Sequence, residues 1–343
     1  MHFMTQRQHS NIDEYGNVLW LDEERLARKA MGYEPYTPPK KGLGIVNFLK
    51  EHISARPWNM GFIHRIFYLV VGGSRWMKED SLRNRLYRWI TMIAPEKKKH
   101  TSAVVLPLDV DLTDAGQKVP VPMDFLKESL RHTTCIVGMP YCICREAGDC
   151  QDYPHDLACL FIGEGARTLV RHGLAEEFTY EQACERIDRA AEMGLFGHAV
   201  WIEVEQLLWG IPNQQMDQFM EICFCCPCCC VGVTLAANGT RDVKQRFHPV
   251  GWTAVADTAK CTGCGLCISG PHGCPQEAIT FGADGKIQIN QEYCVGCGLC
   301  KARCRRDVIK IKQTMPMREN MNEYFEKEFN IDVKVWNEEY TRQ

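Results

Sequence analysis

Twenty cysteines in a chain of 343 residues constrain this protein more than any other feature of its sequence. None precedes Cys135 and none follows Cys304, so every thiol lies in the middle and C-terminal parts of the chain. A cysteine content this high indicates either a disulfide framework or metal ligation. Disulfide frameworks are typical of secreted domains of fewer than about 100 residues, and no apolar signal segment is readable near Met1. We therefore expect a reduced, cytoplasmic protein whose thiols bind metal.

The charge balance and the hydropathy exclude two classes of protein. The chain has 40 Lys and Arg against 43 Asp and Glu, which gives a net charge of −3. A nucleic-acid-binding protein would carry a strong basic excess. No apolar run approaches the roughly 18–20 residues that are needed to cross a bilayer. We therefore expect no nucleic-acid partner and no transmembrane segment.

The C-terminal cysteines form two copies of one unit. The first copy reads CTGCGLC at 261–267, and the second reads CVGCGLC at 294–300. Each copy is followed by one further cysteine, Cys274 or Cys304, and then by a short strand-like run. Three thiolates at two-residue gaps let a tight loop wrap an iron–sulfur cubane, and glycine permits the close approach of the backbone. The fourth thiolate must come from elsewhere, and in a duplicated unit it comes from the other copy.

Residues 255–312 resemble the bacterial two-cluster ferredoxin family, which implies two [4Fe-4S] clusters. The ligands implied for the first cluster are Cys261, Cys264, Cys267 and Cys304. Those implied for the second cluster are Cys294, Cys297, Cys300 and Cys274. The chain departs from the family in a longer loop, Ile268 to Gly273, and in Arg305, which stands where the family has proline. Neither departure removes a ligand, and we expect the longer loop to alter the solvent cover of one cluster.

Zinc is the alternative occupant of these motifs, because paired C-x2-C units also form tetrahedral zinc sites. Each motif here supplies three cysteines rather than two, and this number overfills a zinc ribbon. The spacing therefore favours two iron–sulfur clusters.

The middle of the chain holds a second dense group of cysteines. Buried cysteine can act as a small hydrophobic residue, which suits Cys135 and Cys184, but six cysteines within residues 223–230 are too many for packing alone. We interpret the region as one or two further iron–sulfur clusters. Their candidate ligands are Cys142, Cys144, Cys150, Cys159, Cys225, Cys226, Cys228, Cys229 and Cys230.

The middle pattern also resembles, over residues 135–230, a Cys-rich module that precedes ferredoxin domains in proteins of strict anaerobes. This resemblance implies metal binding and an anaerobic setting, and it gives no activity. The alternative is a non-cubane cluster, which adjacent cysteines provide in subunits of the heterodisulfide-reductase type. The chain lacks the CCG spacing of that family.

A helix predicted after a cap at Asp80 or Ser81 has an apolar and a basic side. Its apolar side consists of Leu82, Leu86, Trp89, Ile90 and Ile93. Its basic side carries Arg83, Arg85 and Arg88. The sequence leaves open peripheral contact of this side with a membrane or an acidic partner, as well as an ordinary solvated helix face.

Composition and periodicity divide the chain into four regions. They are a Cys-free helical docking region (1–100), a helical Cys-rich iron–sulfur region (101–247), the two-cluster ferredoxin domain (248–314) and an acidic, aromatic tail (315–343). Thr179 and Gln182 predict the capped start of a helix in the second region. We therefore predict the α+β class, with mainly helical N-terminal and middle regions and a C-terminal two-cluster ferredoxin-like domain.

These motifs predict an electron-transfer subunit that passes low-potential electrons within an anaerobic oxidoreductase complex. We expect a redox partner that carries a flavin or a metal centre, because no flavin pocket is readable in this chain. No catalytic residue is predicted, since the sequence has no P-loop, Ser-His-Asp arrangement or carboxylate pair. Two alternatives stay open: a reductase whose middle cluster reduces a substrate directly, and a metal-binding scaffold without redox function.

Overall fold

The structure, a computed structural model, describes residues 52–78, 81–91, 101–108, 121–268, 273–329 and 331–341. Most of the predicted docking region therefore lies outside the described residues. Ile93 and the greater part of the longer loop before Cys274 also lie outside them. Within the described residues, helices and mixed sheets agree with the predicted α+β class.

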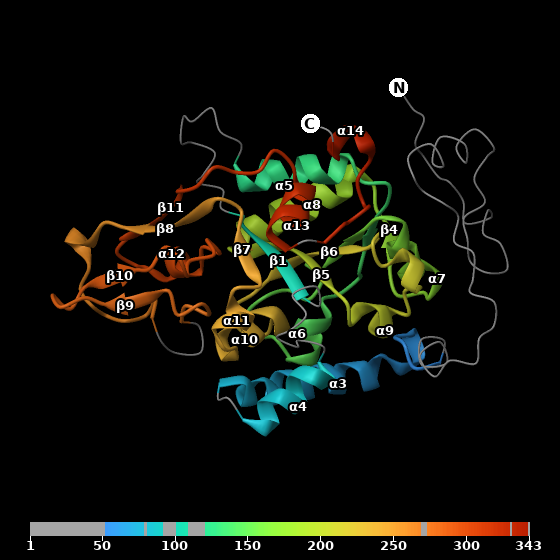
Figure 1. Cartoon of the computed structure of the whole chain (residues 1–343), viewed down its shortest axis with the longest axis horizontal. Helices are drawn as coiled ribbons and strands as arrows, with labels where there is room; N and C mark the ends of the chain where they lie inside the picture. The colour runs from blue at the N-terminus through green and yellow to red at the C-terminus, as the bar shows by residue number, and fades with distance from the viewer. Residues whose placement is uncertain are drawn as a thin grey trace.

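A seven-stranded sheet forms the centre of the described part of the chain (Figure 1). Its strand order is β4-β2-β3-β6-β5-β1-β7, and every neighbouring pair is antiparallel except β1 and β7. The strands are β1 (Thr101–Pro107), β2 (Ile136–Gly138), β3 (Leu160–Ile162), β4 (Glu176–Glu177), β5 (Phe196–Ile202), β6 (Met220–Cys225) and β7 (Phe247–Pro249).

Helices cover both faces of this sheet (Figure 1). One face packs against α5 (Pro122–Arg131), α8 (Tyr180–Glu192) and α13 (Met321–Phe329). The other side holds α6 (Ile143–Ala147), α10 (Val231–Asn238) and α11 (Arg241–Lys244), with α3 (Met60–Gly73) and α4 (Leu82–Ile90) beyond them. Three further short helices are α7 (Arg167–Arg171), α9 (Glu205–Trp209) and α14 (Glu338–Thr341).

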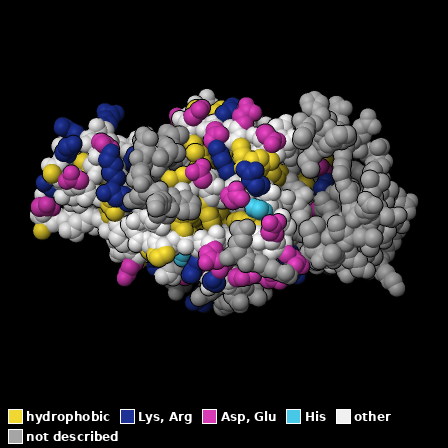
Figure 2. Space-filling model, turned by 90° about the horizontal axis from the view of Figure 1, so that it is seen from above, with side chains coloured by type: hydrophobic (Ala, Val, Ile, Leu, Met, Phe, Trp, Pro, Cys, Tyr) yellow, Lys and Arg dark blue, Asp and Glu magenta, His cyan; other side chains and the backbone are white. Residues whose placement is uncertain are grey.

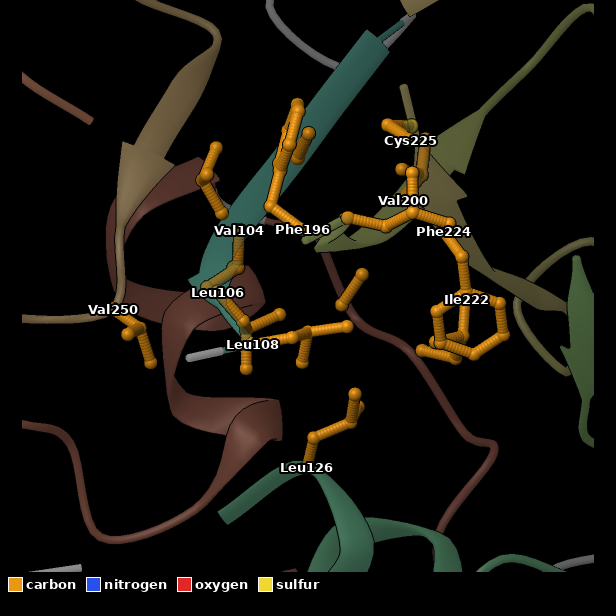
Figure 3. Close-up of a cluster of buried hydrophobic side chains, with 14 of the residues drawn as sticks. Val104, Leu106, Leu108, Leu126, Phe196, Val200, Ile222, Phe224, Cys225 and Val250 are labelled. Atoms are coloured by element: carbon orange, nitrogen blue, oxygen red, sulfur yellow. The ribbon is translucent and has the colours of Figure 1, made fainter. Parts of the chain in front are cut away.

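The buried core explains why β1 is apolar from Ala103 onward. Val104, Val105 and Leu106 are fully buried, as expected for a strand whose sheet is covered on both faces. Figure 3 shows Leu108 of the segment after β1 close to Leu126 of α5 in this core.

The middle region is more mixed than the mainly helical region that the sequence predicts. The expected α8 is present, and Thr179 and Gln182 form its reciprocal capping box. The central sheet is the difference, because four of its strands have only two or three residues. Strands this short show no alternation that a sequence pattern could reveal.

The C-terminal domain, residues 252–313, extends to the left of the central sheet in Figure 1. It contains two antiparallel strand pairs and a short helix. These elements are β8 (Trp252–Ala256) paired with β11 (Ile309–Gln313), β9 (Ile279–Phe281) paired with β10 (Ile287–Ile289), and α12 (Leu299–Arg303).

The aromatic tail returns from the C-terminal domain to the central sheet (Figure 1). Its helix α13 packs against α5 and β1. The Tyr324 hydroxyl donates a hydrogen bond to the Val250 carbonyl at 2.8 Å, and Trp336 forms a β-bridge with Thr133. The sequence suggests a tail suited to packing across another surface, and in this structure that surface belongs to the same chain.

The N-terminal hairpin of α3 and α4 packs below α6 and α10. Ser81 caps α4 by accepting a hydrogen bond from the Asn84 amide at 3.2 Å. Arg88 is buried and forms an ion pair with Asp242, which precludes the predicted place of Arg88 on an exposed basic side. Among the described residues, every helix is too short or too polar to cross a bilayer.

Candidate metal centres

The two C-terminal cysteine motifs lie in loops of the C-terminal domain, and their thiols divide into two sets. The Cys267 thiol interacts electrostatically with Cys261, Cys264 and Cys304. The Cys300 thiol interacts most strongly with Cys297, Cys294 and Cys274. Each of these two sets holds three thiols of one motif and one thiol that follows the other motif.

A cavity lies at the second set. It is lined by all four cysteines of the set and by apolar residues that include Ala254, Ile279 and Leu299. Burial raises the pKa values of Cys297 and Cys300 above the ordinary thiol value. Buried thiols that must ionise need a compensating positive charge, and bound iron supplies it. The cavity and its donor set therefore fit an iron–sulfur cluster.

Backbone amides support one sulfur in each set. The Ala254 amide donates to Cys294 Sγ at 3.4 Å, and the Val308 amide donates to Cys304 Sγ at 3.4 Å. Hydrogen bonds to cluster sulfurs are one of the features by which a protein tunes the reduction potential. Ala254 lies on β8, and Val308 directly precedes β11, the strand that pairs with β8.

Gly296 in the second motif has a conformation and surroundings that only glycine tolerates. Its φ is +71°, in the region that side-chain-bearing residues rarely adopt. A Cβ at this position would lie 1.8 Å from the Trp252 carbonyl oxygen. The motif loop therefore packs directly on the backbone of β8.

The two sets differ in their surroundings. In the first set Cys264 is exposed, beside Leu266 with a relative exposure of 51%. The loop of the second set faces α11, where the Arg241 guanidinium lies over the Tyr293 ring at 3.5 Å and donates to the Gln276 carbonyl at 3.3 Å. The first set is thus open to solvent, whereas the second faces the middle region.

The middle cysteines also divide into two sets. The four-cysteine set joins one thiol that follows α6 to three thiols in the turn between β6 and α10. Its members are Cys150, Cys226, Cys228 and Cys229. All four sulfurs lie within 4.8 Å of one another, and Cys150 Sγ lies 3.5 Å from Cys228 Sγ.

The six-cysteine set forms a closed ring of thiol–thiol contacts. Its order around the ring is Cys142, Cys144, Cys230, Cys225, Cys223, Cys159 and back to Cys142. The sulfurs of Cys225 and Cys230 are 3.0 Å apart, and those of Cys159 and Cys223 are 3.8 Å apart. The nine predicted middle ligands are therefore divided between these two sets, and Cys223 joins the six-cysteine set.

The pKa values of the ring thiols indicate that these thiols ionise together only beside a cation. Hydrogen bonds from Cys144 and Cys159 hold the pKa of Cys142 well below its ordinary value. Hydrogen bonding to Cys142, together with burial, holds the pKa values of Cys144 and Cys159 well above theirs. Few of the six thiols can ionise together without added positive charge, and a metal centre supplies that charge.

Two residues of this region were missed by the sequence reasoning. Cys223 lies two positions before Cys225 on β6, so both side chains project from the same face of the strand. Alternation on a strand would have identified Cys223 as a ligand candidate, had the strand been predicted. No local sequence pattern identifies Arg145, because the groups that it contacts are distant in the sequence.

Arg145 is fully buried beside both middle sets. Its Nη1 donates to the Leu157 carbonyl at 2.6 Å, and its Nη2 donates to the Phe224 carbonyl at 2.7 Å. Burial acts to lower the pKa of this guanidinium, but the thiolates of Cys142 and Cys226 outweigh that effect and raise it. Arg145 is thus a fixed positive charge beside the sulfurs.

Comparisons with known proteins agree with the cysteine pattern of the C-terminal domain. Residues 260–308 match the family model described as the 4Fe-4S dicluster domain. An uncharacterised ferredoxin of Methanocaldococcus jannaschii is 34% identical over 71 residues, which are 20% of this chain and 88% of that protein. No solved structure matches the chain. Through its C-terminal domain, the chain belongs to the ferredoxins with a 4Fe-4S dicluster domain.

Proposed function

We propose that this chain is a multi-cluster iron–sulfur subunit that passes low-potential electrons within an anaerobic oxidoreductase complex. The observation that carries the proposal is the grouping of the eight C-terminal thiols into two sets of four. A [4Fe-4S] cluster in each set would supply reversible one-electron exchange. The residues of this chain hold the irons, exclude water from the second set and donate amide hydrogen bonds to the sulfurs.

The surface of the C-terminal domain supports an acidic redox partner. Figure 2 shows Lys and Arg side chains at the end of the molecule that this domain forms. Exposed basic residues that follow the second motif are Arg305, Arg306, Lys310 and Lys312. Positive charge stabilises a reduced cluster, which is the more negative state, and steers acidic proteins into contact. We propose that the partner is the catalytic subunit and that it carries a flavin or a metal centre.

The difference in exposure suggests the order of the electron path. The first set includes the exposed Cys264 and is the natural point of exchange with the partner. The second set lies toward α11, and α11 follows α10, which begins after Cys230 of the six-cysteine set. In the proposed path, electrons pass from the first set through the second set to the middle region.

The six-cysteine set favours a second candidate function, which is direct reduction of a substrate at this set. Six thiols exceed the four that a cubane uses, and the surplus suits a non-cubane centre that reduces a substrate directly. This candidate predicts that substrate changes the spectrum of the middle centre. An electron-transfer role predicts that only a redox partner changes its oxidation state.

Iron and sulfide analysis of the anaerobically purified full chain, with an EPR redox titration, tests the proposal. We expect about twelve irons per chain, eight from the C-terminal domain and about four from the six-cysteine set. Cys264→Ala and Cys297→Ala should each remove about four irons and one low-potential signal. Cys184→Ser is the control, since Cys184 belongs to neither middle set. About eight irons would contradict a middle cluster, and irreversible loss of iron on reduction would contradict electron transfer.

A further inference from the structure

The separation of the sulfurs distinguishes the four-cysteine set from a cubane site. Four thiolates around one tetrahedral ion, with metal–sulfur bonds of about 2.3 Å, lie about 3.8 Å apart. A cubane places its own irons and sulfides between the thiolates and holds them farther apart. The four-cysteine set, whose four sulfurs all lie within 4.8 Å of one another, matches the single ion, and among the described residues no four thiols of the six-cysteine set do so.

The C-terminal domain provides an internal comparison. Its eight thiols all lie among the described residues, and no three of them come within 4.8 Å of one another. The sets that carry the ferredoxin spacing are therefore wider than the four-cysteine set of the same chain. We infer that Cys150, Cys226, Cys228 and Cys229 bind a single divalent ion, with zinc as the ion that suits four thiolates in a tetrahedron.

The local backbone explains how the four sulfurs meet. Three of them come from the turn CPCC at 226–229, which is tighter than the C-x2-C loops of the C-terminal domain. The fourth follows Asp149, whose φ of +47° turns the chain sharply after α6. A Cβ on Gly148 would lie 3.1 Å from the Cys229 Cβ, so the two segments are in close contact.

The position of the site suggests its role. A divalent ion with four thiolates carries a net negative charge, and two cations face it: Arg145 from α6 and Arg303 from α12, which interacts electrostatically with Cys228. The ion therefore joins the end of α6 to the β6–α10 turn, next to the C-terminal domain. Its role in this position is structural, because zinc has no accessible redox change.

Metal and sulfide analysis of variants of the full chain tests this inference. Cys150→Ser and Cys228→Ser should each remove about one zinc per chain and leave iron and sulfide unchanged. Cys142→Ser, in the six-cysteine set, should remove iron and sulfide and leave zinc in place. Loss of about four irons and four sulfides from Cys150→Ser, or about sixteen irons in the unaltered chain, would overturn the single-ion site.

A second measurement covers the case in which a variant does not fold. The unaltered chain, grown with cobalt in place of zinc, should show thiolate-to-cobalt charge-transfer absorption from a tetrahedral site. Absence of this absorption, with cobalt excluded from the purified protein, would contradict the inference. The dicluster EPR signals report separately on electron transfer, so failure of one proposal is distinguishable from failure of the other.

The N-terminal hairpin of α3 and α4 exposes many large apolar side chains. The apolar stripe of α4 faces solvent, whereas its polar Asn84 and Arg88 face the interior. Leu82 is 82% exposed and Trp89 is 74% exposed. The other large exposed apolar residues of the hairpin and the segment before it are Ile53, Trp58, Phe62, Tyr68, Leu69, Trp76, Leu86 and Ile90. A group of large exposed apolar residues of this kind marks an interaction site.

The charge of the hairpin identifies the surface that it fits. Residues 52–91 contain seven Arg and Lys but only Glu79 and Asp80 as acids. The exposed basic residues beside the apolar side chains are Arg65, Arg75, Lys78, Arg83 and Arg85. Tryptophan and tyrosine favour the boundary between lipid and water, and basic residues attract anionic headgroups. We propose that this face of α3 and α4 binds the surface of an anionic lipid bilayer.

Sedimentation of the full chain with lipid vesicles tests this second proposal. We expect binding to vesicles of phosphatidylcholine with phosphatidylglycerol that falls with salt, and at least tenfold weaker binding to phosphatidylcholine alone. The double variant Leu86→Ser/Trp89→Ser should lose binding, while Met193→Ser, an exposed apolar residue outside the hairpin, should keep it. Equal binding by both variants would contradict the proposal. If the chain self-associates and only the double variant abolishes this, the face of α3 and α4 binds a second copy of the chain instead of lipid.

Discussion

Arg145→Met is expected to cause the largest loss of metal of any single change outside the cysteines. The side chain donates hydrogen bonds to three backbone carbonyls, those of Pro154, Leu157 and Phe224. Methionine has a similar length but leaves these carbonyls unpaired and removes the positive charge beside the thiolates. We expect the free energy of unfolding to fall by at least about 3 kcal/mol, and metal to be lost from both middle sets.

Metal analysis and denaturant unfolding of this variant check the expectation against two controls. Arg145→Lys keeps the charge but cannot reproduce the fork of donors, so it should retain more metal than the methionine variant. Arg189→Met removes an exposed arginine that pairs with Asp156, and should change stability by less than about 0.5 kcal/mol. Full metal content in Arg145→Met would show that the cysteines assemble without this cation.

Gly296→Ala is expected to abolish the second cluster of the C-terminal domain. The added Cβ would meet the Trp252 carbonyl oxygen at 1.8 Å, where the motif loop packs on β8. The loop can avoid this contact only by moving its cysteines. We therefore expect the loss of about four irons per chain and of one EPR signal.

Gly285→Ala separates the steric effect from the backbone effect. Gly285 has a φ of +74°, close to that of Gly296, but a Cβ there meets nothing within 4 Å. Only the cost of the left-handed conformation remains, about 1–2 kcal/mol, and the iron content should stay complete. If both variants keep all their iron, the motif loop can move away from β8 without losing its cluster, which would contradict the prediction.

The sequence predicts the C-terminal thiol sets because their ligands lie close together along the chain. Two-residue gaps and a duplicated unit are local features, and the exchange of the fourth ligand follows from the ferredoxin resemblance. In the middle region the contacts are distant: Cys150 meets Cys228, and Cys159 meets Cys223. Only the folded sheet brings these segments together, so the sequence indicates metal binding there without dividing the ligands into sets.

The α4 helix shows a second limit of sequence patterns. Its cap at Ser81 and its apolar stripe are local and predictable, but the direction in which the stripe faces is not. Arg88 turns inward because Asp242, 154 residues farther along the chain, pairs with it. A periodic pattern identifies the faces of a helix, and a distant partner decides which face is buried.

The paired strands β8 and β11 have a consequence for how the C-terminal domain can move. They bring both ends of the domain together, where the Thr314 and Met315 amides donate to the Gly251 carbonyl at 3.0 and 3.1 Å. The segment before the domain, β7, joins the central sheet, and the segment after it continues to α13, which packs on α5. A domain attached at both ends cannot move as a mobile carrier between distant docking positions. Its clusters must exchange electrons across fixed gaps, so the rate depends on the spacing of the centres and not on the search of a mobile carrier.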